Sequence, residues 1–140
     1  MHIRPFAPID TEATVRLWQA CGLTRPWNNP YTDIERKLRV QPELFLLGAD
    51  EEGAIMASVM AGHDGHRGWI NYLAVLPAHR RQGHATRLMA EAEALLTQRG
   101  CPKLNLQIRA GNEAVIAFYA RLGYVNDQTV VMGKRLIADM

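Results

Sequence analysis

The sequence lacks several features that would point to a function at once. Its two cysteines, Cys21 and Cys101, lie far apart and do not have the spacing of a metal site. We therefore expect reduced thiols rather than a disulfide. No apolar run approaches the ~18 residues that a membrane span needs, and the N-terminal segment has no apolar stretch of the kind found in secretion signals. These absences favour a cytoplasmic protein that is not a membrane protein.

The sequence also carries little net charge. The sequence has 16 basic and 14 acidic residues, a formal charge of +2, and its arginines are scattered. This balance argues against a nucleic-acid-binding domain. The few lysines are Lys37, Lys103 and Lys134. The predominance of arginine has two explanations, contacts to phosphate groups or the base composition of the genome, and the sequence does not separate them.

The 140 residues are enough for one globular domain, residues 1–140, with a substantial core. Periodicity and turn residues predict a mixed α/β (α+β) order, β-α-α-β-β-β-α-β-α-β. The expected elements are a strand over 2–7, a helix capped by Asp10 and ended by Gly22, a short helix beginning at Thr32 or Asp33, strands over 44–49, 54–62 and 69–75, a helix from Ala85 to Gly100, a strand over 103–108, a helix capped by Asn112, and a final strand or strand pair over 124–136.

The segment HRRQGHATRLM, residues 79–89, connects an apolar strand to an amphipathic helix. Free backbone N–H groups and the helix dipole favour an anion at such a helix start. Gly83 permits a close approach of backbone to ligand, and the small Ala85 keeps that approach open. The segment matches neither the dinucleotide fingerprint nor the Walker loop. Taken alone, it fits an anion site and a plain helix start with surface arginines equally well.

The segment NEAVIAFYARLGY, residues 112–124, places Asn112 and Tyr119 on one helical face, two turns apart. A cap asparagine and a core tyrosine would also explain this pair. Together with the strand Leu73-Ala74-Val75 and the stretch RRQGHA, however, the N-x6-Y helix ending in LGY resembles the GNAT superfamily of acetyl-CoA-dependent N-acetyltransferases. The segments ACGLTRPWNNP, DIERKL and VMAGHDGHRGW are similar to its small bacterial YpeA-type members.

The resemblance implies a single domain with a mixed, mostly antiparallel sheet, a V-shaped splay between central strands, and about four flanking helices. It implies acetyl-CoA as co-substrate, direct attack of a primary amine on the thioester, and Tyr119 as the general acid. The Leu73 N–H would polarise the thioester carbonyl, and Asn112 would contact the cofactor arm or hold the helix start. The residues implied in cofactor binding are Leu73, Ala74, Val75, Arg80, Arg81, Gln82, Gly83, His84, Ala85, Thr86, Asn112 and Tyr119.

The sequence leaves the general base open. Related N-terminal acetyltransferases carry a glutamate where this chain has Gln107, which weakens a protein N-terminus as substrate. His66 and Asp64 are candidate bases, although both also suit an exposed turn. A water relay needs neither of them. A metal site formed by these two residues and His63 is not expected, because no further ligand cluster is evident.

We expect the acceptor amine, on a small molecule or a protein, to bind near the segment RPWNNPY. Trp27, Asn28 and Tyr31 are its candidate contacts, although Trp27 would equally fit a plug at the core edge. A non-catalytic acyl-CoA sensor remains an alternative, against which Tyr119 argues. A homodimer is plausible for this fold.

Overall fold

A computed structural model of the chain describes residues 1–139. It divides into two compact units, residues 1–106 with 139, and residues 107–138. The first unit holds the sheet. Its strands are β1 (His2–Pro5), β2 (Phe45–Ala49), β3 (Ile55–His63), β4 (Gly68–Val75) and β5 (Leu104–Leu106), and its helices are α1 (Thr11–Ala20), α2 (Pro30–Leu38) and α3 (His84–Gln98). Three short 3-10 turns cover Pro8–Asp10, Pro42–Leu44 and Pro77–His79.

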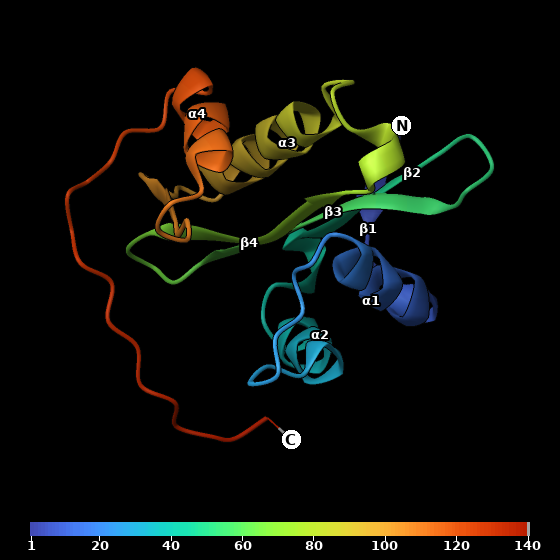
Figure 1. The fold of residues 1–140 in the computed structure, drawn as a ribbon, viewed down its shortest axis with the longest axis horizontal. Coiled ribbons are helices and arrows are strands. Elements are labelled where there is room, and N and C mark those ends of the chain that lie inside the picture. The colour runs from blue at the N-terminus through green and yellow to red at the C-terminus, as the bar shows by residue number, and fades with distance from the viewer. Residues whose placement is uncertain (140) are drawn as a thin grey trace. The chain divides into compact units, whose positions relative to one another are not determined.

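The five strands form one sheet in the order β1-β2-β3-β4-β5. The first four pair antiparallel, and β5 joins β4 in parallel, so the sheet is mixed and mostly antiparallel as expected. Figure 1 shows α1 and α2 on one face of this sheet and α3 on the other. All five residues of β2 are buried, because helices cover both of its faces.

The core beneath α1 and α2 is aromatic. The rings of Phe6 and Phe45 stack with centroids 4.5 Å apart, and Trp18 packs against Phe45. On the opposite face, the apolar stripe of α3 is buried at the helical spacing that the sequence predicted. Its buried residues are Leu88, Met89, Ala92 and Leu96. Within residues 1–139, no helix is long and apolar enough to cross a membrane.

α2 begins earlier than the sequence predicted. Pro30 occupies the first turn, where its missing N–H costs nothing, and the side chain of Asn29 accepts hydrogen bonds from the N–H groups of Tyr31 and Thr32. The expected start at Thr32 or Asp33 was therefore wrong by two or three residues. Asp10 does precede α1, but its carboxylate binds Arg4 and the Ala7 N–H instead of capping that helix.

The second unit contains α4 (Glu113–Arg121), with Asn112 at its N-cap position. The final strand expected over residues 124–136 is wrong, since no strand forms among the described residues after β5. Gln128 adopts a positive φ of 56°, and its N–H bonds to the Asn126 side chain, which turns the chain. Val130 and Val131 are exposed. A strand needs a hydrogen-bonded neighbour, and strand-forming residue types alone do not supply one.

Candidate active site

A β-bulge interrupts β4 at Tyr72 and Leu73. These two residues stand opposite a single residue of β3, Val59, whereas the flanking positions pair one to one. Tyr72 adopts a φ of 51°, a left-handed conformation that is unusual for a bulky side chain. A bulge takes one residue out of the ladder and redirects the strand. The bulge includes Leu73, the residue for which the sequence analysis predicted the thioester contact.

Side chains from three other elements hold this bulge. The Ser58 hydroxyl donates to the Tyr72 carbonyl at 2.7 Å and accepts a hydrogen bond from the Trp18 indole at 3.0 Å. The Tyr72 ring stacks on Trp18 with centroids 3.7 Å apart, and its hydroxyl donates to the Asp33 carboxylate at 2.7 Å. Burial and this bond to Asp33 raise the pKa of Tyr72. The bulge is thus rigidly supported, and the sequence analysis predicted none of these contacts.

The splay predicted from the family resemblance lies between β4 and β5. Parallel pairing with β5 covers only Gly68–Ile70 of β4. The remainder of the strand, Asn71–Val75, has no β5 partner, and β5 is the edge strand of the described sheet. A free strand edge offers N–H and C=O groups to an extended ligand, which can bind there as an added strand would.

The loop between β4 and α3 ends in a backbone cradle. Arg81 and Gly83 both adopt left-handed conformations, with φ of 63° and 80°. No side chain caps the start of α3, so the N–H groups of its first turn keep no partner within the helix. Successive N–H groups in such a turn form a concave anion site. Arg80 lies beside it, with Nε donating to the Val75 carbonyl at 3.1 Å.

The cradle is electropositive. α3 has no acidic residue in its first turn. The pKa of His84, whose ring nitrogen lies 3.1 Å from the Gln82 amide oxygen, is lowered by burial. The N-terminal ammonium, Arg87 and His79 lower it further. The N-terminal ammonium, Arg87 and the helix dipole favour a bound anion.

The second unit contains the other two residues of the predicted site. Asn112 occupies the N-cap position of α4 but makes no side-chain capping hydrogen bond to that helix. Tyr119 is 7% exposed, and its ring edges meet Phe118 and Tyr124 at centroid distances of 5.0 and 5.5 Å. Burial raises the pKa of Tyr119 to about 12. Its phenol is therefore protonated at neutral pH.

The candidate bases lie in the turn before β4, far from the bulge. From His66 to Leu73 the chain runs roughly 20 Å along an extended strand. The Asp64 carboxylate accepts hydrogen bonds from the N–H groups of Arg67 and His66, which lower its pKa to about 2, and one from the Trp69 indole. The Asp64 carboxylate therefore stabilises the turn by accepting these three hydrogen bonds. In residues 1–139, no three metal-ligating side chains gather into a metal site.

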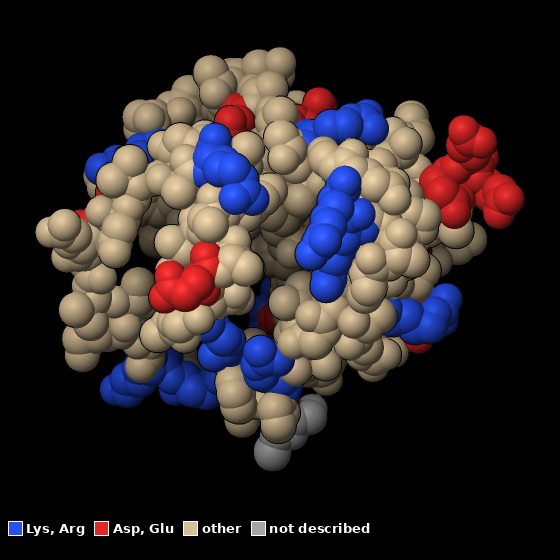
Figure 2. Space-filling view, turned by 45° about the horizontal axis from the view of Figure 1, so that its top comes forward, with Lys and Arg blue, Asp and Glu red and all other residues tan. Residues whose placement is uncertain are grey.

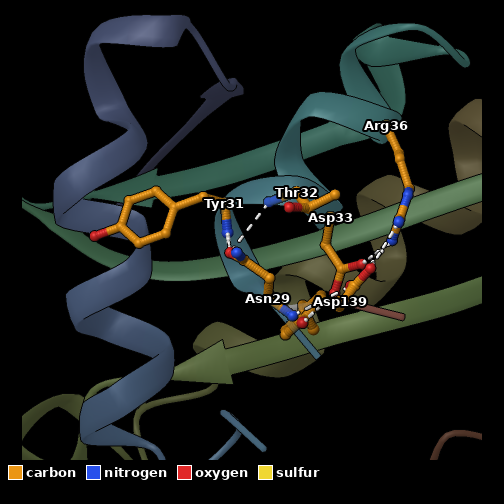
Figure 3. Close-up of polar contacts among 7 residues, drawn as sticks. Asn29, Tyr31, Thr32, Asp33, Arg36 and Asp139 are labelled. Atoms are coloured by element: carbon orange, nitrogen blue, oxygen red, sulfur yellow. Dashed lines mark hydrogen bonds and ion pairs between the residues drawn. The ribbon is translucent and has the colours of Figure 1, made fainter. Parts of the chain in front are cut away.

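The predicted acceptor contacts lie before and at the start of α2. Trp27 is 54% exposed, which excludes the alternative that it plugs the core edge. Asn28 lies beside it in the same loop. Tyr31 points toward α1 (Figure 3). Its hydroxyl donates a hydrogen bond to the Glu12 carboxylate at 3.0 Å. On the face drawn in Figure 2, basic side chains stand in separate groups among acidic ones, so no continuous basic surface appears there.

The sheet, the bulge, the splay and the anion cradle together form the arrangement expected of an acyl-CoA-dependent acyltransferase. Residues 11–124 match the model of the acetyltransferase (GNAT) family. A Yersinia enterocolitica protein named as an acetyltransferase is 51% identical over 99% of this chain and 98% of its own length. The chain therefore belongs to the GNAT acetyltransferase family.

Two solved structures share the fold. The NatB acetyltransferase complex bound to CoA and MES is 25% identical, with a TM-score of 0.76 over 89% of this chain and 84% of that one. An aminoglycoside 6′-N-acetyltransferase from Acinetobacter haemolyticus is 22% identical, with a TM-score of 0.73 over 98% of this chain and 99% of that one. At these identities the likeness concerns the fold, and the acceptor of this chain has to be argued from its own residues.

Proposed function

We propose that this chain transfers the acetyl group of acetyl-CoA to a primary amine by direct attack, and that residues 1–140 act as one catalytic domain. The observation that carries the proposal is the left-handed turn through Arg81 and Gly83 at the start of α3. It follows a strand whose segment Asn71–Val75 has no partner in β5. The family match, residues 11–124, spans both compact units.

The residues present fit acetyl-CoA. A pyrophosphate suits the N–H groups of the cradle, and the free β4 edge suits the amide-bearing pantetheine arm. A Cβ on Gly83 would meet no atom within 4 Å, so the space beside this backbone is open. The cofactor-binding residues we assign are Leu73, Ala74, Val75, Arg80, Arg81, Gln82, Gly83, His84, Ala85, Thr86 and Asn112.

Two groups of the chain serve the chemistry. The N–H of Leu73, at the bulge, donates to the thioester carbonyl and stabilises the negative charge that develops there. Tyr119 donates a proton to the departing thiolate. With a pKa of about 12, Tyr119 is a weaker acid than a thiol of ordinary pKa ~8.5, so its phenolate must be reprotonated at once. The proton lost by the attacking amine serves that purpose.

Neither Asp64 nor His66 suits the role of base, since both lie at the far end of β4 and Asp64 is used by its turn. We therefore assign the removal of the amine proton to ordered water, which passes that proton on to the Tyr119 phenolate. We assign Trp27, Asn28 and Tyr31, which lie before and at the start of α2, as the acceptor contacts.

A thiol-release assay tests this function. The purified chain is incubated with acetyl-CoA and panels of amino acids, polyamines, aminoglycosides and peptides, while calorimetry measures acetyl-CoA binding. We expect micromolar binding and amine-dependent release of CoA. Binding without release for any amine would favour a non-catalytic acyl-CoA sensor. Absence of binding would contradict the proposal altogether.

A further inference from the structure

The peptide group between Tyr72 and Leu73 is held at its carbonyl. The Ser58 hydroxyl donates to the Tyr72 carbonyl at 2.7 Å and accepts a hydrogen bond from the Trp18 indole at 3.0 Å. A trans peptide places its N–H opposite its C=O, and the described residues have no cis peptide bond. The Leu73 N–H therefore points away from Ser58 and β3, toward the side of β4 on which Asn71–Val75 has no partner in β5.

The same hydrogen bonds make the Leu73 N–H a stronger donor. Hydrogen bonds in a chain polarise one another, so donation from Trp18 to Ser58 and from Ser58 to the Tyr72 carbonyl draws electron density from the peptide nitrogen. Trp18 and Ser58 are both fully buried, so water does not compete for these bonds. A buried serine is costly unless its hydroxyl is used. Here the hydroxyl is used for the peptide group that carries the Leu73 N–H.

The Tyr72 side chain gives this peptide a second attachment, at Asp33 of α2. Its hydroxyl donates to the Asp33 carboxylate at 2.7 Å, and its ring stacks on Trp18. Asp33 lies in the first turn of α2 (Figure 3), and its own N–H donates to the Asn29 carbonyl at 3.0 Å. Burial, the hydrogen bond to Asp33 and the negative charge of Asp33 raise the pKa of Tyr72. The hydroxyl therefore keeps its proton and remains a donor.

Tyr72 depends on these attachments because its backbone is strained. Its φ of 51° lies in the left-handed region, which a bulky side chain adopts only where the surroundings enforce it. Relaxation to an ordinary conformation would turn the peptide plane that follows Tyr72, and the Leu73 N–H would turn with it. Ser58 opposes this rotation at the carbonyl, and Asp33 opposes it at the far end of the side chain.

We propose that Asp33 and Ser58 are positioning residues for the thioester contact, and that they hold the Tyr72–Leu73 peptide from two sides so that its N–H meets the thioester carbonyl. The inference rests on the proposed function, in which this N–H stabilises the charge on that carbonyl. Asp33 acts through its hydrogen bond to Tyr72 and takes no proton from the amine. α2, the helix next to the assigned acceptor contacts, thereby also orients the acetyl group.

The test removes the bond between Asp33 and Tyr72 from either end. Tyr72→Phe loses the hydroxyl and keeps the ring that stacks on Trp18, and Asp33→Ala loses the acceptor. Asp33→Asn is the conservative variant, because its amide oxygen still accepts the hydroxyl. Glu12→Ala is the matched control, since Glu12 accepts the Tyr31 hydroxyl at 3.0 Å in a second tyrosine–carboxylate bond of α2. Thermal melting confirms that each variant is folded.

Two measurements are made on each variant. Thiol release gives kcat and the KM for acetyl-CoA. Infrared difference spectra of bound acetyl-CoA, labelled with carbon-13 at the acetyl carbonyl, report hydrogen bonding to that carbonyl without any amine. We expect Tyr72→Phe and Asp33→Ala to lower kcat about tenfold, to change KM by less than about twofold and to move the carbonyl band to higher frequency. Ser58→Ala should move the band in the same direction. Asp33→Asn and Glu12→Ala should resemble the wild type in both measurements.

The double variant of Asp33→Ala with Tyr72→Phe should lose no more kcat than Tyr72→Phe alone, because both changes remove the same hydrogen bond. Additive losses would overturn the positioning role. An Asp33→Asn variant as impaired as Asp33→Ala would also overturn it, in favour of proton transfer to the carboxylate. If the carbonyl band depends on Asp33 and no amine is acetylated, the proposed function fails and the positioning role stands. If amines are acetylated while Tyr72→Phe and Asp33→Ala change neither kcat nor the band, the positioning role fails and the function stands.

Discussion

The Tyr72 ring stacks on the Trp18 indole with centroids 3.7 Å apart and planes inclined by 12°, and this contact joins α1 to the bulge of β4. Tyr72 has a positive φ of 51°, a conformation that costs free energy and persists only where the surroundings enforce it. Trp18 and Ser58, both fully buried, supply that enforcement. The geometry at Leu73 therefore depends on side chains that are buried in the core.

Ser58→Ala tests this support. The substitution leaves the Trp18 indole N–H and the Tyr72 carbonyl without their hydrogen-bond partner in a buried place. We expect a loss of about 2–4 kcal/mol in the free energy of unfolding, measured by urea denaturation, because each unsatisfied buried group costs ~1–3 kcal/mol. Turnover should fall more than acetyl-CoA affinity, since the bulge positions the Leu73 N–H. Thr97→Ala, at an exposed hydroxyl of α3, is the control and should change stability little.

Gly83→Ala tests the cradle, with Gly53→Ala as a matched control. Both glycines have positive φ, 80° and 86°, and a Cβ at either would meet no atom within 4 Å. Each substitution should therefore cost a similar ~1 kcal/mol of stability through backbone strain alone. Only Gly83→Ala should weaken acetyl-CoA binding, by roughly tenfold in calorimetry, because its methyl group occupies the approach to the N–H groups. Equal affinities of the two variants would place the pyrophosphate elsewhere.

The sequence alone was enough to predict those features that depend on residues close together in the chain. The cradle follows from a glycine between a strand and a periodic helix, and the buried face of α3 follows from its spacing. The bulge does not follow, because its supports are distant in sequence. Trp18 and Ser58 are 40 residues apart, and Asp33 and Tyr72 are 39 apart. Hydrogen bonds over such separations exist only once the sheet has brought the residues together.

The predicted role of Asp64 and the predicted final strand both depend on neighbouring groups that the sequence pattern does not show. Asp64 was a candidate base because carboxylates accept protons, but in a tight turn its oxygens are used by neighbouring N–H groups. The expected strand over residues 124–136 had suitable residue types and lacked a pairing partner. The ion pair of Arg36 with Asp139 joins residues that are 103 positions apart, so no local pattern indicates it.

Asp64→Asn and His66→Ala test whether the turn takes part in catalysis. Asparagine keeps an oxygen that accepts the N–H groups of the turn, so the fold should be retained. We expect thiol release at neutral pH to stay within about twofold of the wild type in both variants, well short of the ~100-fold or larger loss typical of an essential base. Because the pKa of Asp64 is lowered to about 2, its contribution to stability is present above pH ~4 and is lost as the pH falls through 2. A pH titration of the melting temperature of Asp64→Asn should lack that step.

Tyr119→Phe tests the general acid. The phenyl ring keeps the packing against Phe118 and Tyr124, so acetyl-CoA binding should be unchanged while kcat falls on the order of 100-fold. Tyr124→Phe is the neighbouring control and should retain most turnover.

Burial raises the pKa of Tyr119 to about 12, so folding favours its protonated form. The resulting stability is complete below pH ~10 and is lost as the pH rises toward 12, a change on the order of 2–3 kcal/mol. Phenolate absorbance and the free energy of unfolding, both followed from pH 9 upward, should show this loss in the wild type and a smaller one in Tyr119→Phe. Unchanged kcat in the folded variant would exclude Tyr119 as the proton donor and leave the departing thiolate to solvent.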